Sequence, residues 1–247
     1  MKSKMMIVLL LATAVAGQLI AGELDDILSK HYEAVGGKDT VMSLKSMKAT
    51  AKIVISSPQG DMEIPLDMKT KDNTKARVES NFQGMVMVQA TDGENSWQIN
   101  PMMGSSEPQD MSADEAKDMK MRADISGDLF NYKEKGYTLE YAGKEDVEGT
   151  ETFKIVVNDG DDKRYYFLDT EYYLIIKSSS EVNMMGATQI IESFPSDYKK
   201  VNGHLFPHAI SQKMPMGDMT ITFENVEFNV DIDDEIFKKP AATAEAK

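Results

Sequence analysis

The sequence predicts a mainly antiparallel β protein with a few helices. From residue 49 to residue 230 most segments alternate apolar and polar residues with a period of two, which is typical of strands with one wet and one dry face. Short turn sequences such as Asp92-Gly93 and Asn202-Gly203 separate these segments and favour tight hairpins. Only two stretches before the first strand carry helical spacing. We expect residues 23–240 to form one domain, since all-β folds of this length are often undivided.

A secretory signal peptide is predicted over residues 1–22. Lys2 and Lys4 form a positive region, and residues 5–16 form an apolar run that ends in small side chains. This run is shorter than the roughly 20 residues that span a bilayer as a helix. We therefore expect export to the periplasm with cleavage of the leader, and a mature protein that begins between Gly17 and Glu23.

The composition restricts the partners. The chain has no cysteine, so neither a disulfide nor lipid attachment to an N-terminal cysteine is open to it. Its formal net charge of −14 repels phosphate backbones and anionic head groups. We therefore expect no nucleic acid partner and no stable membrane insertion.

Two helical stretches precede the first strand. Apolar residues recur at the spacing of one helical face between Leu24 and Val35, and Gly36-Gly37 supplies a left-handed stop. A shorter helical piece through Val41 and Leu44 leads into the sheet. The longer helix should lie on an apolar surface, because one of its faces is apolar.

The clearest strand runs from Met62 to Met68. Its apolar residues Met62, Ile64, Leu66 and Met68 face one way while Asp61, Glu63, Asp67 and Lys69 face the other, which predicts a sheet with one wet and one dry face. Further segments with the composition and period of strands cover residues 49–55, 76–82, 85–90, 96–99, 137–142, 153–157, 164–168, 173–178, 188–194, 209–213 and 219–230.

A segment of different character, residues 101–132, interrupts the strands. Ser112 with Glu115 three residues on forms a capping box, and the apolar residues that follow predict a helical flap over the dry face. After Pro240 only small and charged residues remain, so residues 241–247 are expected to be a disordered tail.

Nothing in the sequence forms a catalytic signature, and we expect no enzymatic activity, no cofactor and no metal. His204 and His208 have a metal-like separation, but Pro207 lies between them, and we interpret them as part of a surface loop. Asp159, Asp161 and Asp162 lack the rest of a calcium loop, so a hairpin turn is the better interpretation.

Methionine needs an explanation, since the chain has 19. Methionine fills irregular cores, but it also lines deformable binding surfaces. A long one-sided sheet with methionine on its dry face and in the flap is what an acyl-chain pocket would need. The candidate ligand-binding residues are Met62, Ile64, Leu66, Met68, Met85, Met87, Trp97, Ile99, Met119, Leu129 and Phe130.

Several segments, in order, resemble one known family. Asp92-Gly93 followed by Trp97 and Asn100-Pro101 is similar to a strand of the LolA-like periplasmic lipoprotein carriers, the outer-membrane lipoprotein-sorting proteins. The segments that resemble its longer relatives are ILSKHYEAVGG from Ile27, LFNYKEKGY from Leu129, YYFLD from Tyr165, DYKKVNGHLFP from Asp197 and NVDIDDEIFKKP from Asn229. The resemblance covers nearly the whole chain after the leader.

The resemblance implies an unclosed antiparallel β half-barrel whose concave face is covered by the N-terminal helix and a helical lid. It implies a carrier that holds the acyl chains of lipoproteins or lipids and helps sort them to the outer membrane, with inner- and outer-membrane transfer proteins as further partners. The family's best-studied carriers keep cargo movable with an arginine near a strand end, where this chain offers Lys69 or Lys71. The alternative is an envelope sensor or interaction module that uses the same half-barrel; an additional domain would favour it, and none is predicted.

Overall fold

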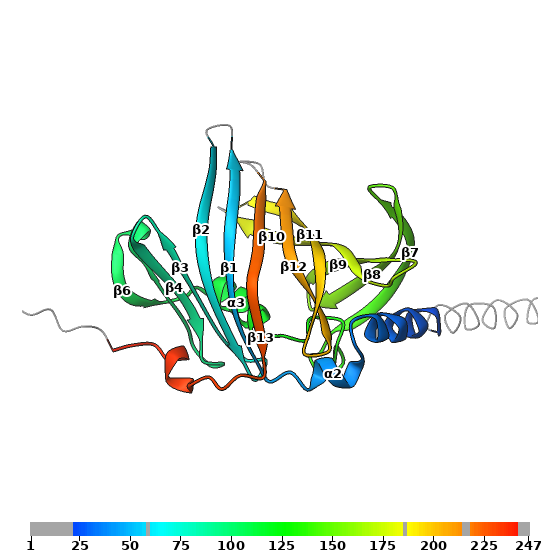
Figure 1. The fold of residues 1–247 in the computed structure, drawn as a ribbon, viewed down its shortest axis with the longest axis horizontal. Coiled ribbons are helices and arrows are strands. Elements are labelled where there is room, and N and C mark those ends of the chain that lie inside the picture. Colours follow the sequence, from blue (N-terminus) through cyan, green and yellow to red (C-terminus); the bar gives the residue numbers. More distant parts are fainter. Residues whose placement is uncertain (1–21, 58–59, 185–186, 214–217, 242–247) are drawn as a thin grey trace, which may run out of the picture. The chain divides into compact units, whose positions relative to one another are not determined.

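Thirteen strands make up most of the computed structural model, which describes residues 22–57, 60–184, 187–213 and 218–241 (Figure 1). The predicted mainly β class is confirmed, and the strand pairings of the described residues are antiparallel. The strands are β1 (Ser46–Ser57), β2 (Gly60–Lys71), β3 (Lys75–Phe82), β4 (Met85–Thr91), β5 (Ser96–Asn100), β6 (Ser105–Asp110), β7 (Thr138–Val147), β8 (Thr150–Asp159), β9 (Asp162–Asp169), β10 (Ile175–Met184), β11 (Ala187–Val201), β12 (His204–Lys213) and β13 (Met219–Phe228).

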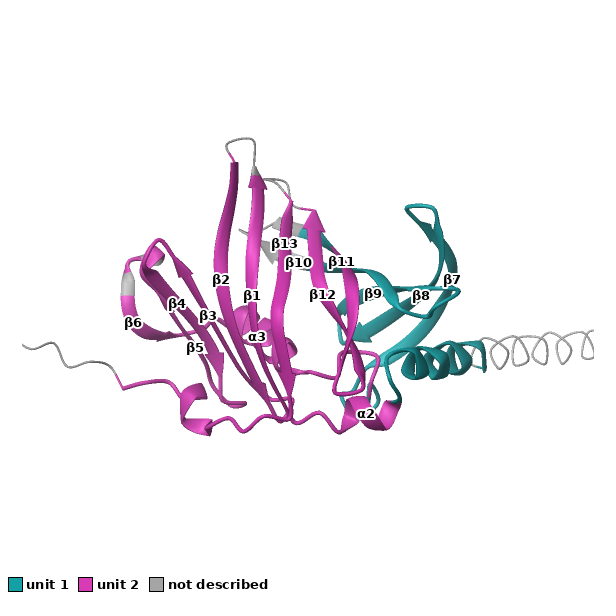
Figure 2. Cartoon of the chain, viewed as in Figure 1, with its two compact units in different colours: residues 1–37, 131–192 teal, residues 38–130, 193–247 magenta. Residues whose placement is uncertain are grey.

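Backbone hydrogen bonds order the strands as β6-β5-β4-β3-β2-β1-β13-β12-β11-β10-β9-β8-β7. Neighbouring strands in this order are also consecutive in the chain, except that β1 lies beside β13. Because β6 and β7 stand at opposite ends of this order, the sheet of the described residues is unclosed, as predicted. The chain divides into two compact units, residues 1–37 with 131–192 (unit 1) and residues 38–130 with 193–247 (unit 2), and the division falls within β11 (Figure 2).

The helices are few and short. Residues 22–34 are helical, followed by α2 (Lys38–Met42), the 3-10 turn η1 (Pro101–Met103), α3 (Ala113–Ala123) and the 3-10 turn η2 (Asp234–Phe237). The predicted N-terminal helix is therefore confirmed from residue 22 onward. The predicted capping box is confirmed as well, since Ser112 Oγ accepts from the Glu115 N–H and the Glu115 carboxylate accepts from the Ser112 N–H. The predicted signal peptide up to residue 21 and the predicted tail from residue 242 lie outside the described residues.

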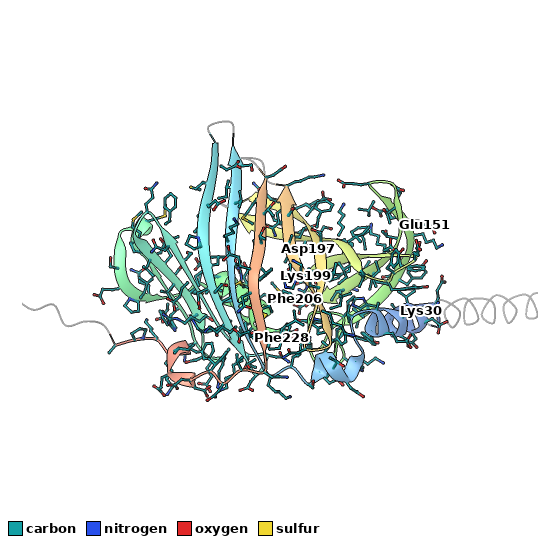
Figure 3. The ribbon with its side chains drawn as sticks, viewed as in Figure 1. Lys30, Glu151, Asp197, Lys199, Phe206 and Phe228 are labelled. Atoms are coloured by element: carbon teal, nitrogen blue, oxygen red, sulfur yellow. The ribbon has the colours of Figure 1, made fainter. Side chains whose placement is uncertain are left out.

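In unit 1 the N-terminal helix is fastened to the turn between β9 and β10. Lys30, which is labelled in Figure 3, donates through Nζ to the Tyr173 hydroxyl at 3.1 Å, and the same Nζ lies 5.0 Å from the centre of the Tyr173 ring. His31 Nδ1 lies 2.8 Å from the Tyr173 carbonyl oxygen. The Tyr173 ring stacks on Phe153 of β8 with 5.5 Å between the ring centres. Apolar Ile27 and Leu28 are buried, so this helix does lie on an apolar surface.

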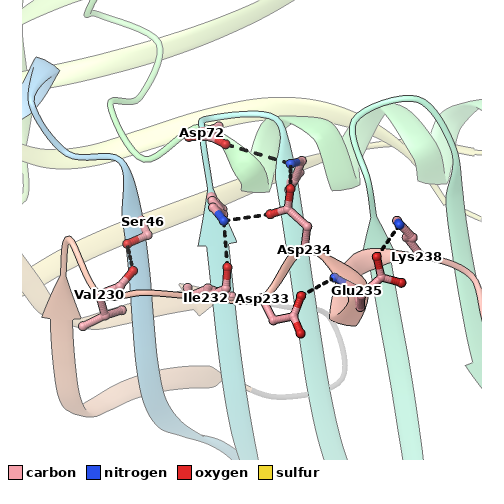
Figure 4. A network of polar contacts seen from close by, with 10 residues as sticks. Ser46, Asp72, Val230, Ile232, Asp233, Asp234, Glu235 and Lys238 are labelled. Atoms are coloured by element: carbon pink, nitrogen blue, oxygen red, sulfur yellow. Dashed lines mark hydrogen bonds and ion pairs between the residues drawn. The ribbon is translucent and has the colours of Figure 1, made fainter.

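In unit 2 the segment after β13, residues 229–240, forms a strap. Side chains from four strands donate to its carbonyl groups at 2.5 to 2.8 Å. Ser46 Oγ of β1 donates to Val230 and Lys71 Nζ of β2 donates to Ile232 (Figure 4). Arg77 Nη1 of β3 donates to Ile236, and Trp97 Nε1 of β5 donates to Phe237. The strap thus crosses β1, β2, β3 and β5 in that order. Phe237 is fully buried at its end, so the strap closes an apolar cluster as well as making polar contacts.

Asp234 is the charged centre of the strap. Its carboxylate contacts Lys71 Nζ at 2.8 Å and Lys75 Nζ at 2.7 Å, and these two hydrogen-bonded ammonium groups lower the pKa of Asp234 to about 2 from its ordinary 3.8 (Figure 4). A carboxyl whose pKa is depressed by folding adds stability above its ordinary pKa, and this stability is lost as the pH falls toward 2.

We expect Asp234→Asn to lower the urea midpoint of unfolding at pH 7, with the difference from the wild type shrinking as the pH falls from about 4 toward 2. Urea titrations at several pH values measure it. Asp61→Asn, at an exposed carboxylate near the other end of β2, is the control and should change little. A difference between Asp234→Asn and wild type that stays constant with pH would contradict this linkage.

The segment predicted as a helical flap differs from the expectation at its start. Residues 105–110 form strand β6, which pairs with β5, and only residues 113–123 are α-helical. Because the sequence Ser-Ser-Glu-Pro-Gln-Asp has no apolar alternation, its strand conformation comes from pairing with β5 and not from its own pattern. The flap of unit 2 is therefore α3 together with the residues that follow it.

Candidate functional site

The strand register assigns the side chains of unit 2 to two faces, because residues opposite each other in neighbouring strands point to the same side. Ile64, Leu66 and Met68 of β2 lie opposite Ile53, Ala51 and Ala49 of β1. The same register continues into β3, β4, β13 and β12. The apolar face of unit 2 so defined comprises Met47, Ala49, Ala51, Ile53, Ile55, Met62, Ile64, Leu66, Met68, Val78, Phe82, Met85, Met87, Ile210, Met219, Ile221, Phe223, Val226 and Phe228.

The side chains that β1 to β4 contribute to this face are uncharged in the part of the chain that the structure describes. Along β1, β2, β3 and β4, as far as the structure describes them, the residues of the apolar face include no Asp, Glu, Lys or Arg. The acidic and basic residues of β2, such as Glu63, Asp67 and Lys69, all point to the other face. A chain with a net charge of −14 therefore keeps an uncharged surface on one side of this sheet.

α3 lies over one end of the apolar face. Met119 and Ala123 are buried against Ala76 of β3, and Val78 packs beside them. The Gln98 amide on β5 donates to the Glu115 carboxylate at 3.1 Å. At the end of the helix the Ile125 N–H donates to the side chain of Asn73 in the β2–β3 turn at 3.2 Å. The predicted lid is thus a helix fastened to the sheet at both of its ends.

Burial changes along the strands of the apolar face. Near α2 and α3 the side chains are buried in one cluster that includes Ala49, Ala51, Leu66 and Phe223. Toward the β1–β2 turn the residues of the same face are partly exposed, and these are Ile53, Ile55, Met62, Ile64, Phe82, Met85, Met87, Met219 and Ile221. The partly exposed end offers apolar surface that a bound molecule could cover.

His204 and His208 are not in a surface loop, and that interpretation is wrong. Both lie in β12 and are buried, at 8% and 7% exposed, and they flank Phe206 on the side of the apolar face. The Phe206 ring lies 5.2 Å from Phe223 and 5.7 Å from Phe228, edge to face (Figure 3). The histidines are therefore part of an aromatic cluster, and in the described residues no group of three or more His, Asp or Glu is arranged to hold a metal.

Two hollows of unit 2 outside the apolar face are lined mainly by charged and polar residues. One of about 480 Å³ lies beside the strap, lined by Lys69, Arg77 and Lys238 among others, and one of about 390 Å³ lies near Lys45 and Lys71. In unit 1 a hollow of about 300 Å³ is lined by Lys154 and Lys177, each paired with a glutamate. Charged linings of this kind do not suit hydrocarbon.

Comparison with solved structures identifies the fold. A LolA superfamily protein from Nitrosomonas europaea is similar with a TM-score of 0.61 and 15% identity, over 85% of this chain and 96% of that one. An outer membrane lipoprotein-sorting protein domain from Vibrio parahaemolyticus gives 0.56 and 13%, over 87% and 95%. The fold is that of the LolA superfamily. A DUF1329 family protein from Desulfovibrio piger is also similar to this chain, with a TM-score of 0.56 and 14% identity over 84% of this chain and 95% of that one. No protein-family model and no curated relative matches the sequence.

Within this LolA fold the predicted ligand-binding residues fall into three groups. Met62, Ile64, Leu66, Met68, Met85 and Met87 share the apolar face. Met119 of α3 packs on it, while Leu129 and Phe130 are buried beyond the helix. Trp97 and Ile99 lie opposite Ala90 and Val88, on the other face of the sheet, so the register separates them from the rest.

The lysines that match the family's arginine in sequence also lie on the other face. Lys69 is ion-paired with Asp67, and Lys71 contacts the strap through the Ile232 carbonyl and Asp234. The resemblance implied an arginine that keeps cargo movable at this point, whereas the Lys69 ammonium pairs with Asp67 of its own strand and the Lys71 ammonium holds the C-terminal strap. None of the helices in the described part of the chain is long and apolar enough to cross a membrane.

Proposed function

We propose that this chain is an exported carrier, without enzymatic activity, that binds the acyl chains of lipoproteins or lipids on the apolar face of unit 2. The observation that carries the proposal is the partly exposed end of that face, which is uncharged and continuous over β1 to β4 and β13. Support also comes from the LolA fold, since one protein with a similar fold is designated an outer membrane lipoprotein-sorting protein domain.

The energetics suit reversible binding. Removing a methylene group from water is worth about 0.8 kcal/mol, so an acyl chain gains affinity with each carbon that the face covers. Binding also costs translational and rotational freedom, which leaves only part of this gain as affinity. The flexible methionine side chains at Met62, Met85 and Met87 adapt to a chain without one fixed shape. A carrier needs this combination, since it must release what it binds.

The proposed cellular role follows from the leader and the fold. A signal peptide cleaved near residue 22 would send the mature protein to the periplasm, where it would carry cargo toward the outer membrane. Transfer proteins of the inner and outer membranes would then load and unload it.

Purified protein tests the proposal. We expect the wild type to bind a fluorescent fatty acid saturably, and the protein isolated from its native envelope to carry lipid that mass spectrometry detects. A water-soluble dye without an acyl chain is the control and should not bind. Wild-type protein that binds no acyl probe and contains no lipid would overturn the carrier function.

A further inference from the structure

Among the described residues, the apolar face of unit 2 has five partly exposed methionines besides the buried Met47. Met62 and Met68 come from β2, Met85 and Met87 from β4, and Met219 from β13. Ile55 of β1 lies between Met62 on one neighbouring strand and Met219 on the other. Met87 lies opposite Ser80 of β3, which in turn lies opposite Leu66 of β2. All five are partly exposed, whereas Met47 and Met119 are buried at 7% and 2% exposed.

Every sulfur atom of this chain is a methionine thioether, because the chain has 19 methionines and no cysteine. An oxidant that reaches the protein can therefore act on sulfur only at methionine, and accessible side chains react first. On this sheet the accessible methionines and the proposed lipid-contacting surface coincide.

We propose that the five partly exposed methionines of the apolar face are a reversible oxidation site, and that their oxidation switches acyl-chain binding off. The inference rests on the proposed function. In the reaction a methionine Sδ lone pair attacks one oxygen of a peroxide. An S–O bond forms, the O–O bond breaks, and water or an alcohol leaves. The sulfur is oxidised to the sulfoxide by two electrons and the peroxide is reduced by two.

The sulfoxide changes what the face can bind. The sulfoxide oxygen is a strong hydrogen-bond acceptor, yet an acyl chain has no donor. The residues that β1 to β4 contribute to the apolar face include no Lys or Arg that could donate instead. A bound chain would have to strip water from each sulfoxide without replacing it. Enzymes that reduce methionine sulfoxide restore the apolar thioether, so the change is reversible.

The experiment compares fatty acid binding before and after hydrogen peroxide treatment, with peptide mass mapping of every methionine. We expect the five methionines to gain oxygen before Met47 and Met119 do, and the affinity of the wild type to fall about tenfold or more. Incubation with both methionine sulfoxide reductases should restore it. The variant with M62L, M68L, M85L, M87L and M219L is compared with its own untreated sample, and peroxide should leave its affinity unchanged, because leucine has no sulfur to oxidise.

The M102L variant is the control, since Met102 is 58% exposed but lies in η1, outside the strand rows. It should remain as sensitive to peroxide as the wild type. If the five-site variant is unstable, M85L with M87L replaces it and should lower the sensitivity in part. Oxidised wild type that binds unchanged, or a five-site variant as sensitive as the wild type, would overturn the inference while leaving the carrier function standing. Untreated wild type that binds no fatty acid would instead overturn both.

Discussion

Trp97→Ala should lower the free energy of unfolding by about 3 to 5 kcal/mol, the usual cost of deleting a fully buried aromatic side chain. Trp97 has no exposed surface and packs with Val88 and Ala90 on the strap side of the sheet. Its Nε1 donates to the Phe237 carbonyl at 2.8 Å, and the Arg77 guanidinium lies 5.5 Å from its ring centre. The substitution therefore removes the apolar packing of the indole ring, a hydrogen bond and a cation–π contact together.

Urea denaturation measures this loss, and Val86→Ala provides a matched control. Val86 lies on the same face of β4 as Val88 and Ala90, which contact Trp97, but it is 46% exposed. Its truncation should therefore cost less than about 0.5 kcal/mol. Trp97→Phe keeps most of the buried ring and should fall between the two. A Trp97→Ala variant no less stable than Val86→Ala would mean that the strap does not depend on this tryptophan.

The strands could be predicted from the sequence because their pattern is local. The alternation from Met62 to Met68 needs only a period of two and one buried face, and β2 has that pattern with Leu66 buried and Glu63 exposed. The capping box at Ser112 and Glu115 is likewise a property of four adjacent residues.

The assignment of residues to a common face could not be predicted in the same way. Trp97 and Ile99 alternate with Gln98, which indicates that they are buried but not on which side. That side depends on the length of the turn between β4 and β5, because one residue more or less would reverse every side chain. The sheet also has an apolar cluster on its strap side, which the sequence pattern of β5 alone does not reveal.

The burial of the histidines and the partners of the strap also depend on tertiary contacts, which a local sequence pattern does not contain. His204 and His208 are polar residues near a proline, and their burial depends on Phe206, Phe223 and Phe228, which β12 and β13 bring together. The strap residues bind cationic and indole side chains of strands that lie more than a hundred positions earlier in the chain. No local pattern indicates such partners.

Ile64→Glu should abolish acyl-chain binding while leaving the protein folded. Ile64 stands opposite Ile53 on the partly exposed end of the apolar face, so the introduced carboxylate keeps access to water when nothing is bound. A bound chain would cover that charge, at a cost that should weaken fatty acid affinity by at least about a hundredfold at neutral pH. Lower pH should restore part of the affinity, because a covered carboxyl binds a proton more readily.

Two further variants separate binding from folding. Asp67→Ala, on the opposite face of the same strand, should leave fatty acid binding unchanged. Leu66→Glu puts the charge in the buried cluster beside Ala51, where Leu66 is 9% exposed, and should unfold unit 2 instead of only blocking the ligand. Fluorescence titration gives the affinities and circular dichroism reports the fold. If folded Ile64→Glu protein binds the fatty acid as the wild type does, the partly exposed end of the apolar face is not where the acyl chain lies.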